Sequence, residues 1–323
     1  MNFPTWIAAV MALMWAGAAT AATVGFETAA APVVGDKPLQ VLIWYPSTAP
    51  EKTEPLALGQ QTVAHGGAMA PGRHPLIVFS HGTGGSGGDH FDTAQALARA
   101  GFVVAAISHT GDTYNDHSRA LRIAERPAQL TQAIDYMTGA WRSHEALDAQ
   151  RIGAFGFSSG GFTVLSAVGG EPDLSQVGQH CARHPHFYDC GMQRQFGGYP
   201  AGMITTVSHD PRIRAAVVAA PALGFTFAPA GLAKVTVPVQ LWRAEWDTVL
   251  PQPFYAQVVR DALPKPPEYH VVSGADHFDF LPTCSAGLAK AAPSICGDGV
   301  FDRAVFHARF NADVVRFFEK TLR

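Results

Sequence analysis

The sequence has little charge, few cysteines and no long apolar run beyond its first residues. Charged residues make up 15% of the 323 positions, and the formal net charge is −3. A chain with 47% hydrophobic residues and so little charge is neither a disordered polymer nor a long solvated coiled coil. A net negative charge gives no general attraction to phosphates, so we expect no nucleic-acid partner.

The first residues have the pattern of a leader. The uncharged run from Trp6 to Ala19 has 14 residues, which suits the apolar core of a secretory signal and is too short to span a bilayer. Ala19-Thr20-Ala21 fits an A-x-A cleavage site, although no Lys or Arg precedes the run. We therefore expect residues 1–21 to be a signal peptide and the protein to be secreted or periplasmic. An uncleaved membrane anchor is the alternative.

The rest of the sequence has no second apolar stretch long enough to cross a membrane, and we expect no stable membrane insertion after the leader is cleaved. No internal repeat or low-complexity linker divides residues 22–323. We expect these residues to form a single domain, whose oligomeric state the sequence leaves open.

The four cysteines lack the CxxC spacing of common zinc sites, and no HExxH motif accompanies them. Export makes disulfides possible, and the spacing favours two short local pairs, Cys181 with Cys190 and Cys284 with Cys296. Each would stabilise the fold by at most about 3 kcal/mol, by restricting the unfolded chain. A metal site is the alternative for the first pair, because histidines surround it, namely His180, His184 and His186. We expect no metal.

Strand patterns alternate with helix patterns along most of the chain. Apolar or β-rich runs predict strands at 39–45, 76–79, 102–107, 152–157, 213–219, 237–242 and 269–272. Helical patterns cover about 88–100, 127–141, 160–168, 253–262 and 301–320. This alternation predicts an α/β fold, with a mostly parallel central sheet and helices on both faces. Two parts do not fit it: residues 46–74, which we expect to be irregular after a strand that stops at Pro46, and residues 170–205, an expected insertion over the strand ends.

A G-x-S-x-G motif follows the predicted strand at 152–157. It consists of Gly156, Ser158 and Gly160 with Phe157 and Ser159 between them. A serine on a sharp strand-to-helix turn presents its hydroxyl clear of the sheet, and the flanking glycines let strand and helix come close. Shifting the motif by one residue to Ser159 puts Phe157 where the first glycine belongs, so Ser158 is the candidate nucleophile.

A serine nucleophile needs a histidine base that a carboxylate orients. His277 follows the last predicted strand, and Asp247 follows the strand before it. Ser158, Asp247 and His277 thus come in the order Ser, Asp, His, each just beyond a strand. The other acids in these two loops are Glu245, Asp276 and Asp279.

The same chemistry needs two backbone amides that receive the developing oxyanion. The residue after the nucleophile, Ser159, supplies one candidate at a helix N-terminus. The other should lie in the glycine-rich stretch Ser80–Gly85, which follows the predicted strand at 76–79.

The stretches IVFSHGTGG, RIGAFGFSSGG, WDTVLP and GADHFDFL resemble the α/β-hydrolase superfamily. They are similar in particular to exported relatives of platelet-activating-factor acetylhydrolases and to the "predicted dienelactone hydrolases". The resemblance covers most of residues 39–320. It implies Ser158 as nucleophile, Asp247 as acid, His277 as base and the backbone amides of Thr83 and Ser159 as oxyanion hole. Dienelactone hydrolases use a cysteine nucleophile, so the serine argues against dienelactone as the substrate.

The leading hypothesis is a serine hydrolase that cleaves small carboxylic esters through an acyl-enzyme, without a metal or organic cofactor. The alternatives are a lactonase, a phospholipid acetylhydrolase, a peptidase, or a non-catalytic secreted binding protein on the same scaffold. Six aromatic residues are candidates either for the wall of an acyl pocket or for core packing, namely Phe187, Tyr188, Phe196, Tyr199, Phe225 and Phe227.

Overall fold

The computed structural model describes residues 23–56, 58–198, 206–297 and 299–323. The predicted leader, residues 1–21, lies outside the described residues. Within them, ten strands form one sheet in the order β10-β9-β8-β7-β5-β6-β2-β1-β4-β3. The strands are β1 (Thr23–Ala31), β2 (Leu39–Ser47), β3 (Lys52–Leu56), β4 (Gly59–His65), β5 (His74–Ser80), β6 (Val103–Ser108), β7 (Leu147–Phe157), β8 (Ile213–Ala219), β9 (Val239–Ala244) and β10 (Glu268–Val272).

The six neighbouring strands from β10 to β6 are all parallel. They correspond to the apolar runs that predicted buried strands. Every residue of β5 is buried, because both faces of the sheet are covered. Leu76 and Val78 face one half of the core, whereas Ile77 and Phe79 face the other.

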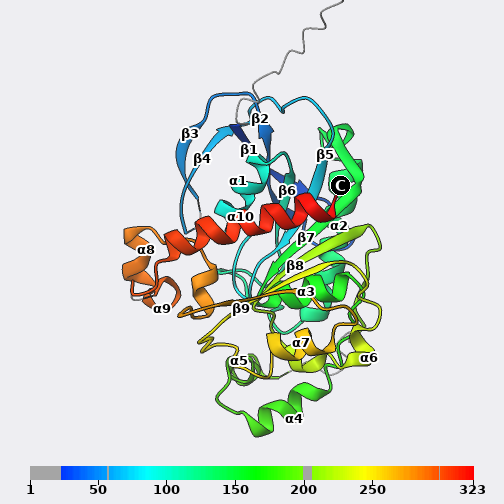
Figure 1. The fold of residues 1–323 in the computed structure, drawn as a ribbon, viewed down its shortest axis with the longest axis vertical. Coiled ribbons are helices and arrows are strands. Elements are labelled where there is room, and N and C mark those ends of the chain that lie inside the picture. The colour runs from blue at the N-terminus through cyan, green and yellow to red at the C-terminus, as the bar shows by residue number, and fades with distance from the viewer. Residues whose placement is uncertain (1–22, 57, 199–205, 298) are drawn as a thin grey trace, which may run out of the picture.

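Helices pack on both faces of this parallel part (Figure 1). One half of the core includes residues of α2 (Arg126–Gly139), α3 (Ser159–Ala167) and α7 (Ala256–Ala262). The other half includes residues of α1 (Phe91–Arg99) and α10 (Arg303–Thr321). The other α-helices of the described residues are α4 (Gln176–Arg183), α5 (Tyr188–Gln195), α6 (Pro229–Leu232), α8 (Ala286–Ala291) and α9 (Pro293–Cys296).

The prediction for residues 46–74 was wrong. β2 continues through Pro46 to Ser47, and β3 and β4 form an antiparallel hairpin at the far edge of the sheet. Proline has no backbone N–H to donate, and it is tolerated in β2 and β3 because each proline lies where one side of its strand has no neighbouring strand. The pairing of β2 with β6 ends at Trp44, so Pro46 has a neighbouring strand on one side only. Pro55 lies in the edge strand β3.

Residues 170–205 depart from the alternation, as expected. Helices α4 and α5 lie in this segment, and residues 199–205 are outside the described ones. Among the described residues, no helix is both long and apolar enough to cross a membrane.

The packing of α10 yields a test of the core. Phe310 is fully buried and its ring lies 5.0 Å from that of Trp242 and 5.7 Å from that of Phe280, centroid to centroid. We expect Phe310→Ala to lower the free energy of unfolding by about 3–5 kcal/mol, because it leaves a cavity. Chemical denaturation measures this, and Arg309→Ala, at an exposed position of the same helix, should change it by less than about 0.5 kcal/mol. Equal effects of the two substitutions would contradict the packing described.

Candidate active site

Ser158 occupies a strained turn between β7 and α3. Its φ of 55° lies in the left-handed region that a residue with a side chain rarely adopts. The turn is fixed on both sides, because the Ser158 amide donates to the Ala219 carbonyl at 2.9 Å and the Ser158 carbonyl accepts from the Gly161 and Ala222 amides. Such a conformation persists only where the surroundings determine it, and here it directs the hydroxyl away from the sheet.

The glycines of the motif are required by close backbone contacts. A Cβ on Gly160 would lie 1.8 Å from the Ser80 carbonyl oxygen, at the end of β5. A Cβ on Gly156 would lie 2.0 Å from the Gly160 carbonyl oxygen. Strand β7, the first turn of α3 and the end of β5 therefore come together only because these positions have no side chain.

A hydrogen-bond chain joins the three residues that the sequence singles out. His277 Nε2 lies 3.1 Å from Ser158 Oγ, and His277 Nδ1 lies 2.9 Å from Asp247 Oδ2. All three side chains are buried. Because the carboxylate accepts at Nδ1, the ring has its proton there, which leaves Nε2 free to accept from the serine hydroxyl.

The Asp247 carboxylate is held by the backbone of its own loop. Its Oδ1 accepts from the amides of Val249 at 3.1 Å and Leu250 at 2.6 Å. These bonds turn the other oxygen, Oδ2, toward His277 and stabilise the buried charge.

The other acids of these loops have different partners. Asp276 accepts from the amide and hydroxyl of Thr248 and from the His277 amide. Asp279 accepts from Arg303 Nε at 2.8 Å, and Glu245 accepts from the Ser273 hydroxyl and the Gly274 amide. Asp247 is therefore the acid that contacts the His277 ring among the described residues.

Thr83 and Ser159 face each other across the site. Their hydroxyl oxygens are 2.5 Å apart, which links the loop after β5 to the start of α3. Among the described residues, no acceptor is bonded to the backbone amide of either one. Two unpaired amides beside a serine hydroxyl are able to receive a negatively charged oxygen.

A cavity of about 490 Å³ opens beside Thr83. Its lining is mostly apolar and comes from the loop after β5, the residues next to Ser158 and His277, and the helices α8 and α9. It comprises Leu58, Gly82, Thr83, Gly84, Gly85, Ser86, Asp89, Tyr114, Phe157, Phe278, Leu281, Leu288 and Ile295. Burial raises the pKa of the Asp89 carboxyl to about 6, although two hydrogen bonds from Ser86 oppose this rise.

None of the described aromatic residues considered as pocket walls lines this cavity. Phe187 and Phe225 pack on His180 instead, and the Phe225 ring stacks on it at 3.7 Å, centroid to centroid. Phe227 is fully buried against Phe162 in the core. Tyr188 and Phe196 are likewise absent from the lining, and Tyr199 lies outside the described residues. Part of the wall is formed by Leu288 of α8 and Ile295 of α9, which lie between Cys284 and Cys296 in a segment that contains no aromatic residue.

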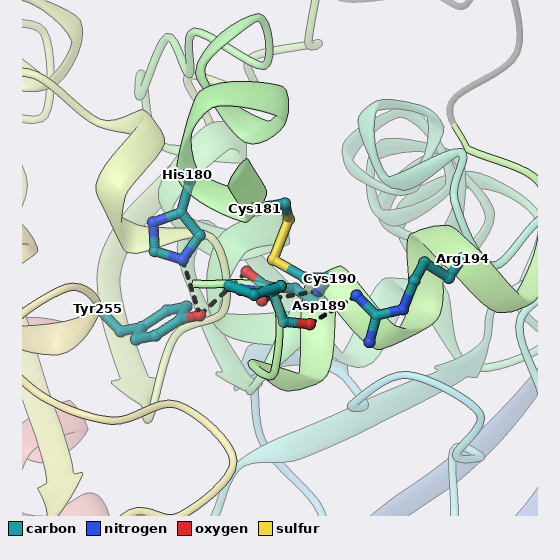
Figure 2. Close-up of a disulfide and its surroundings, with 7 residues drawn as sticks. His180, Cys181, Asp189, Cys190, Arg194 and Tyr255 are labelled. Carbon is teal, nitrogen blue, oxygen red and sulfur yellow. Dashed lines mark hydrogen bonds between the residues drawn. A yellow bond between two sulfur atoms is a disulfide. The ribbon is translucent and has the colours of Figure 1, made fainter. Parts of the chain in front are cut away.

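Both expected cysteine pairs are disulfides, Cys181–Cys190 and Cys284–Cys296. Figure 2 shows the first pair between His180 and Asp189, with the Tyr255 hydroxyl donating to Asp189 at 3.0 Å. Ligand atoms of His180, Asp189 and Cys190 lie within 4.8 Å of one another. The Cys190 sulfur is bonded to Cys181, so it offers no thiolate to a metal ion. Burial, with the charges of His184 and Arg183, lowers the pKa of His180 to about 4.

Comparison with known proteins supports the fold. The family model described as the prolyl oligopeptidase family, a family with the α/β-hydrolase fold, matches residues 89–180, which contain Ser158. No curated protein matches the chain. The solved structure of a ferulic acid esterase from Streptomyces cinnamoneus is similar, with a TM-score of 0.63 and 21% sequence identity over 95% of this chain and 92% of that one.

The chain has the α/β-hydrolase fold. This confirms the predicted fold class, whereas the narrower resemblance to exported acetylhydrolases stays a prediction. In this fold, polar residues beyond the carboxyl ends of the strands form the site, and Ser158, Asp247 and His277 follow β7, β9 and β10.

The close contact at Gly160 yields a test of the turn. Gly160→Ala should lower the free energy of unfolding by roughly 1–3 kcal/mol or more, because the new methyl group collides with the Ser80 carbonyl. Gly178→Ala is the matched control, since no atom lies within 4 Å of its added Cβ in α4. It should be neutral or stabilise by up to about 1 kcal/mol. Urea denaturation compares them, and similar stability of the two variants would show that α3 does not approach β5 as described.

Proposed function

We propose that the protein is a serine hydrolase that cleaves carboxylic esters through an acyl-enzyme intermediate. The observation that carries this proposal is the hydrogen-bonded chain from Ser158 through His277 to Asp247. Next to it lie the amides of Thr83 and Ser159, for which the described part of the chain provides no acceptor. The three side chains and the two amides together fit the requirements of nucleophilic acyl transfer.

In the proposed first step, Ser158 Oγ attacks the ester carbonyl while His277 Nε2 takes the hydroxyl proton. Asp247 keeps the Nδ1 proton of His277 in place and stabilises the imidazolium that forms. The carbonyl oxygen becomes negatively charged and accepts hydrogen bonds from the Thr83 and Ser159 amides, each worth on the order of 10²–10³ in rate. His277 then gives the proton to the departing alcohol oxygen, which leaves the acyl group on Ser158.

In the second step, His277 takes a proton from water, whose oxygen attacks the acyl carbonyl. The same amides receive the oxyanion, and the carbon–oxygen bond to Ser158 breaks. The acid is released and the proton returns to Ser158 Oγ. These steps require only the residues named and water.

The acyl group is expected to occupy the apolar cavity beside Thr83. A volume of about 490 Å³ admits a short or medium acyl chain or a single ring with its linker. Lactones and acetylated phospholipids offer the same kind of carbonyl and remain alternative substrates within this mechanism.

We also propose that the protein acts outside the cytoplasm. The two disulfides support this, because such bonds persist in oxidising compartments. The predicted leader points the same way.

The nucleophile is tested by substitution at Ser158. Ser158→Ala should lower kcat for p-nitrophenyl esters by about 10⁴–10⁶, because no other described hydroxyl contacts His277 Nε2. The wild type should also react with a fluorophosphonate probe, and this variant should not. Ser159→Ala, which keeps its backbone amide, should keep the label. Activity of Ser158→Ala within tenfold of wild type would refute the assignment, and an inert Ser158 in folded wild type would favour a binding protein.

Peptide hydrolysis is a second candidate, favoured by the match of residues 89–180 to the prolyl oligopeptidase family. The same serine chemistry cleaves amides, and p-nitroanilide peptides beside p-nitrophenyl esters in one panel separate the two candidates.

The acyl pocket is tested by filling it. Leu288→Trp should reduce kcat/KM for p-nitrophenyl octanoate by about tenfold or more while p-nitrophenyl acetate changes by less than about threefold, because the larger side chain occupies the cavity. Lys290→Trp, at an exposed position of the same helix, is the matched control and should leave the ratio of the two substrates unchanged. If Leu288→Trp leaves that ratio unchanged too, the acyl chain lies elsewhere.

A further inference from the structure

A buried ion pair lies beneath the loop that contains Thr83. Arg126, the first residue of α2, has its Nη1 3.8 Å from Oδ2 of Asp112, which lies in the loop after β6. Each residue is only 3% exposed. Burial lowers the pKa of Arg126 to about 10, so the guanidinium is charged at neutral pH. No sequence motif connects these two residues to the site, so neither is predictable from the sequence.

The two side chains hold the loop on both sides of Thr83. Arg126 Nη2 donates to the carbonyl oxygen of His81, two residues before Thr83. Asp112 Oδ1 accepts from the amide of Gly84, one residue after it, at 2.8 Å. The direction of the Thr83 amide is thus set by a cation on one side and an anion on the other.

Two buried histidines complete this support. His81 Nε2 accepts from the His109 amide at 3.0 Å, so its Nδ1 donates to the Gly82 carbonyl at 2.6 Å. His109 Nδ1 lies 2.8 Å from Gln129 Oε1, and its Nε2 lies 2.8 Å from Ser80 Oγ. Burial and the nearby Arg126 charge lower the pKa of both rings, which keeps them neutral. The start of α2 is therefore connected to the loop through several hydrogen bonds.

Stability alone does not account for Arg126. A cation at the first position of a helix faces the positive end of the helix dipole. Its Nε and Nη1 atoms are buried without a hydrogen-bond partner among the described residues. Replacing a buried ion pair by apolar residues is often neutral or stabilising, so this arrangement is unfavourable for the fold by itself. Local violations of this kind concentrate at functional sites.

We propose that Arg126 and Asp112 are positioning residues that aim the Thr83 amide at the oxyanion of the proposed reaction. The inference rests on the proposed ester hydrolysis. Neither side chain touches the substrate. Their effect is on the geometry of a hydrogen-bond donor that is used most strongly in the transition state.

The test compares transition-state and ground-state effects. Arg126→Met and Asp112→Leu should lower kcat for p-nitrophenyl acetate by about 10–100-fold and change KM by less than about threefold. The inhibition constant of benzeneboronic acid should rise by about the same factor as kcat falls, because its tetrahedral adduct with Ser158 needs the same amide. Asp112→Asn, which keeps an oxygen for Gly84, and Arg126→Lys, which keeps a cationic donor, should stay within about fivefold of wild type.

Arg212→Met is the structural control. Arg212 pairs with the buried Asp210 just before β8, at the end of the parallel strands opposite the site. It should lower the melting temperature and leave kcat and the inhibition constant within about twofold.

The proposal is overturned if folded Asp112→Leu keeps the wild-type kcat and inhibition constant, or if Asp112→Asn falls as far as Asp112→Leu. The comparison of Asp112→Leu with Asp112→Asn tests the proposal even if Arg126→Met does not fold. A wild type that neither hydrolyses esters nor reacts with the fluorophosphonate would refute the proposed function and this inference together. If the wild type is active and the Asp112 variants keep its kcat and inhibition constant, this inference alone is refuted.

Discussion

The site depends on one close contact, between the first turn of α3 and the end of β5. The Gly160 position touches the Ser80 carbonyl so closely that a single added carbon would fall 1.8 Å from it. Since β5 and β7 are adjacent parallel strands, this contact brings the loops after both strands to the same edge of the sheet. Ser158, the Ser159 amide and Thr83 meet there. The strained φ of Ser158 is the local cost of that geometry.

The carboxylates of Asp247 and Asp112 are buried near this edge, and each is held by oriented donors. Asp247 has two backbone amides and His277, and Asp112 has the Gly84 amide and Arg126. Buried charges held in this way do not need to reorganise when a substrate oxygen becomes negative. The neutral His81 and His109 fit the same pattern, because they provide fixed hydrogen bonds without adding a second cation next to Arg126. The electrostatics of the site are therefore largely set before any ligand enters.

The parts of the fold that the sequence predicted are those with a strong local signal. Fully buried strands such as β5 and β6 contain continuous apolar runs, and the residues just beyond β7, β9 and β10 followed from strand order. β1 and the β3–β4 hairpin were missed, because half-exposed strands such as TVGFETAAA and KTEPL have no such run. Arg126 and Asp112 were missed for a different reason. Their role arises only from contacts between residues far apart in the sequence, which a motif does not encode.

The part of the cavity wall formed by α8 and α9 is held in place differently from the residues proposed to be catalytic. Helices α8 and α9 have six and four residues and no buried side chain, so neither has enough turns or packing to be stable by itself. The Cys284–Cys296 disulfide closes this segment at both ends and holds Leu288 and Ile295 at the cavity. The groups proposed to be catalytic, in contrast, lie just beyond the ends of core strands. A segment tied by one covalent bond and supported by little packing is able to change its sequence without disturbing the sheet. Under the proposed function, residues 284–296 should therefore contribute to substrate preference through Leu288 and Ile295, together with the lining from the loop after β5.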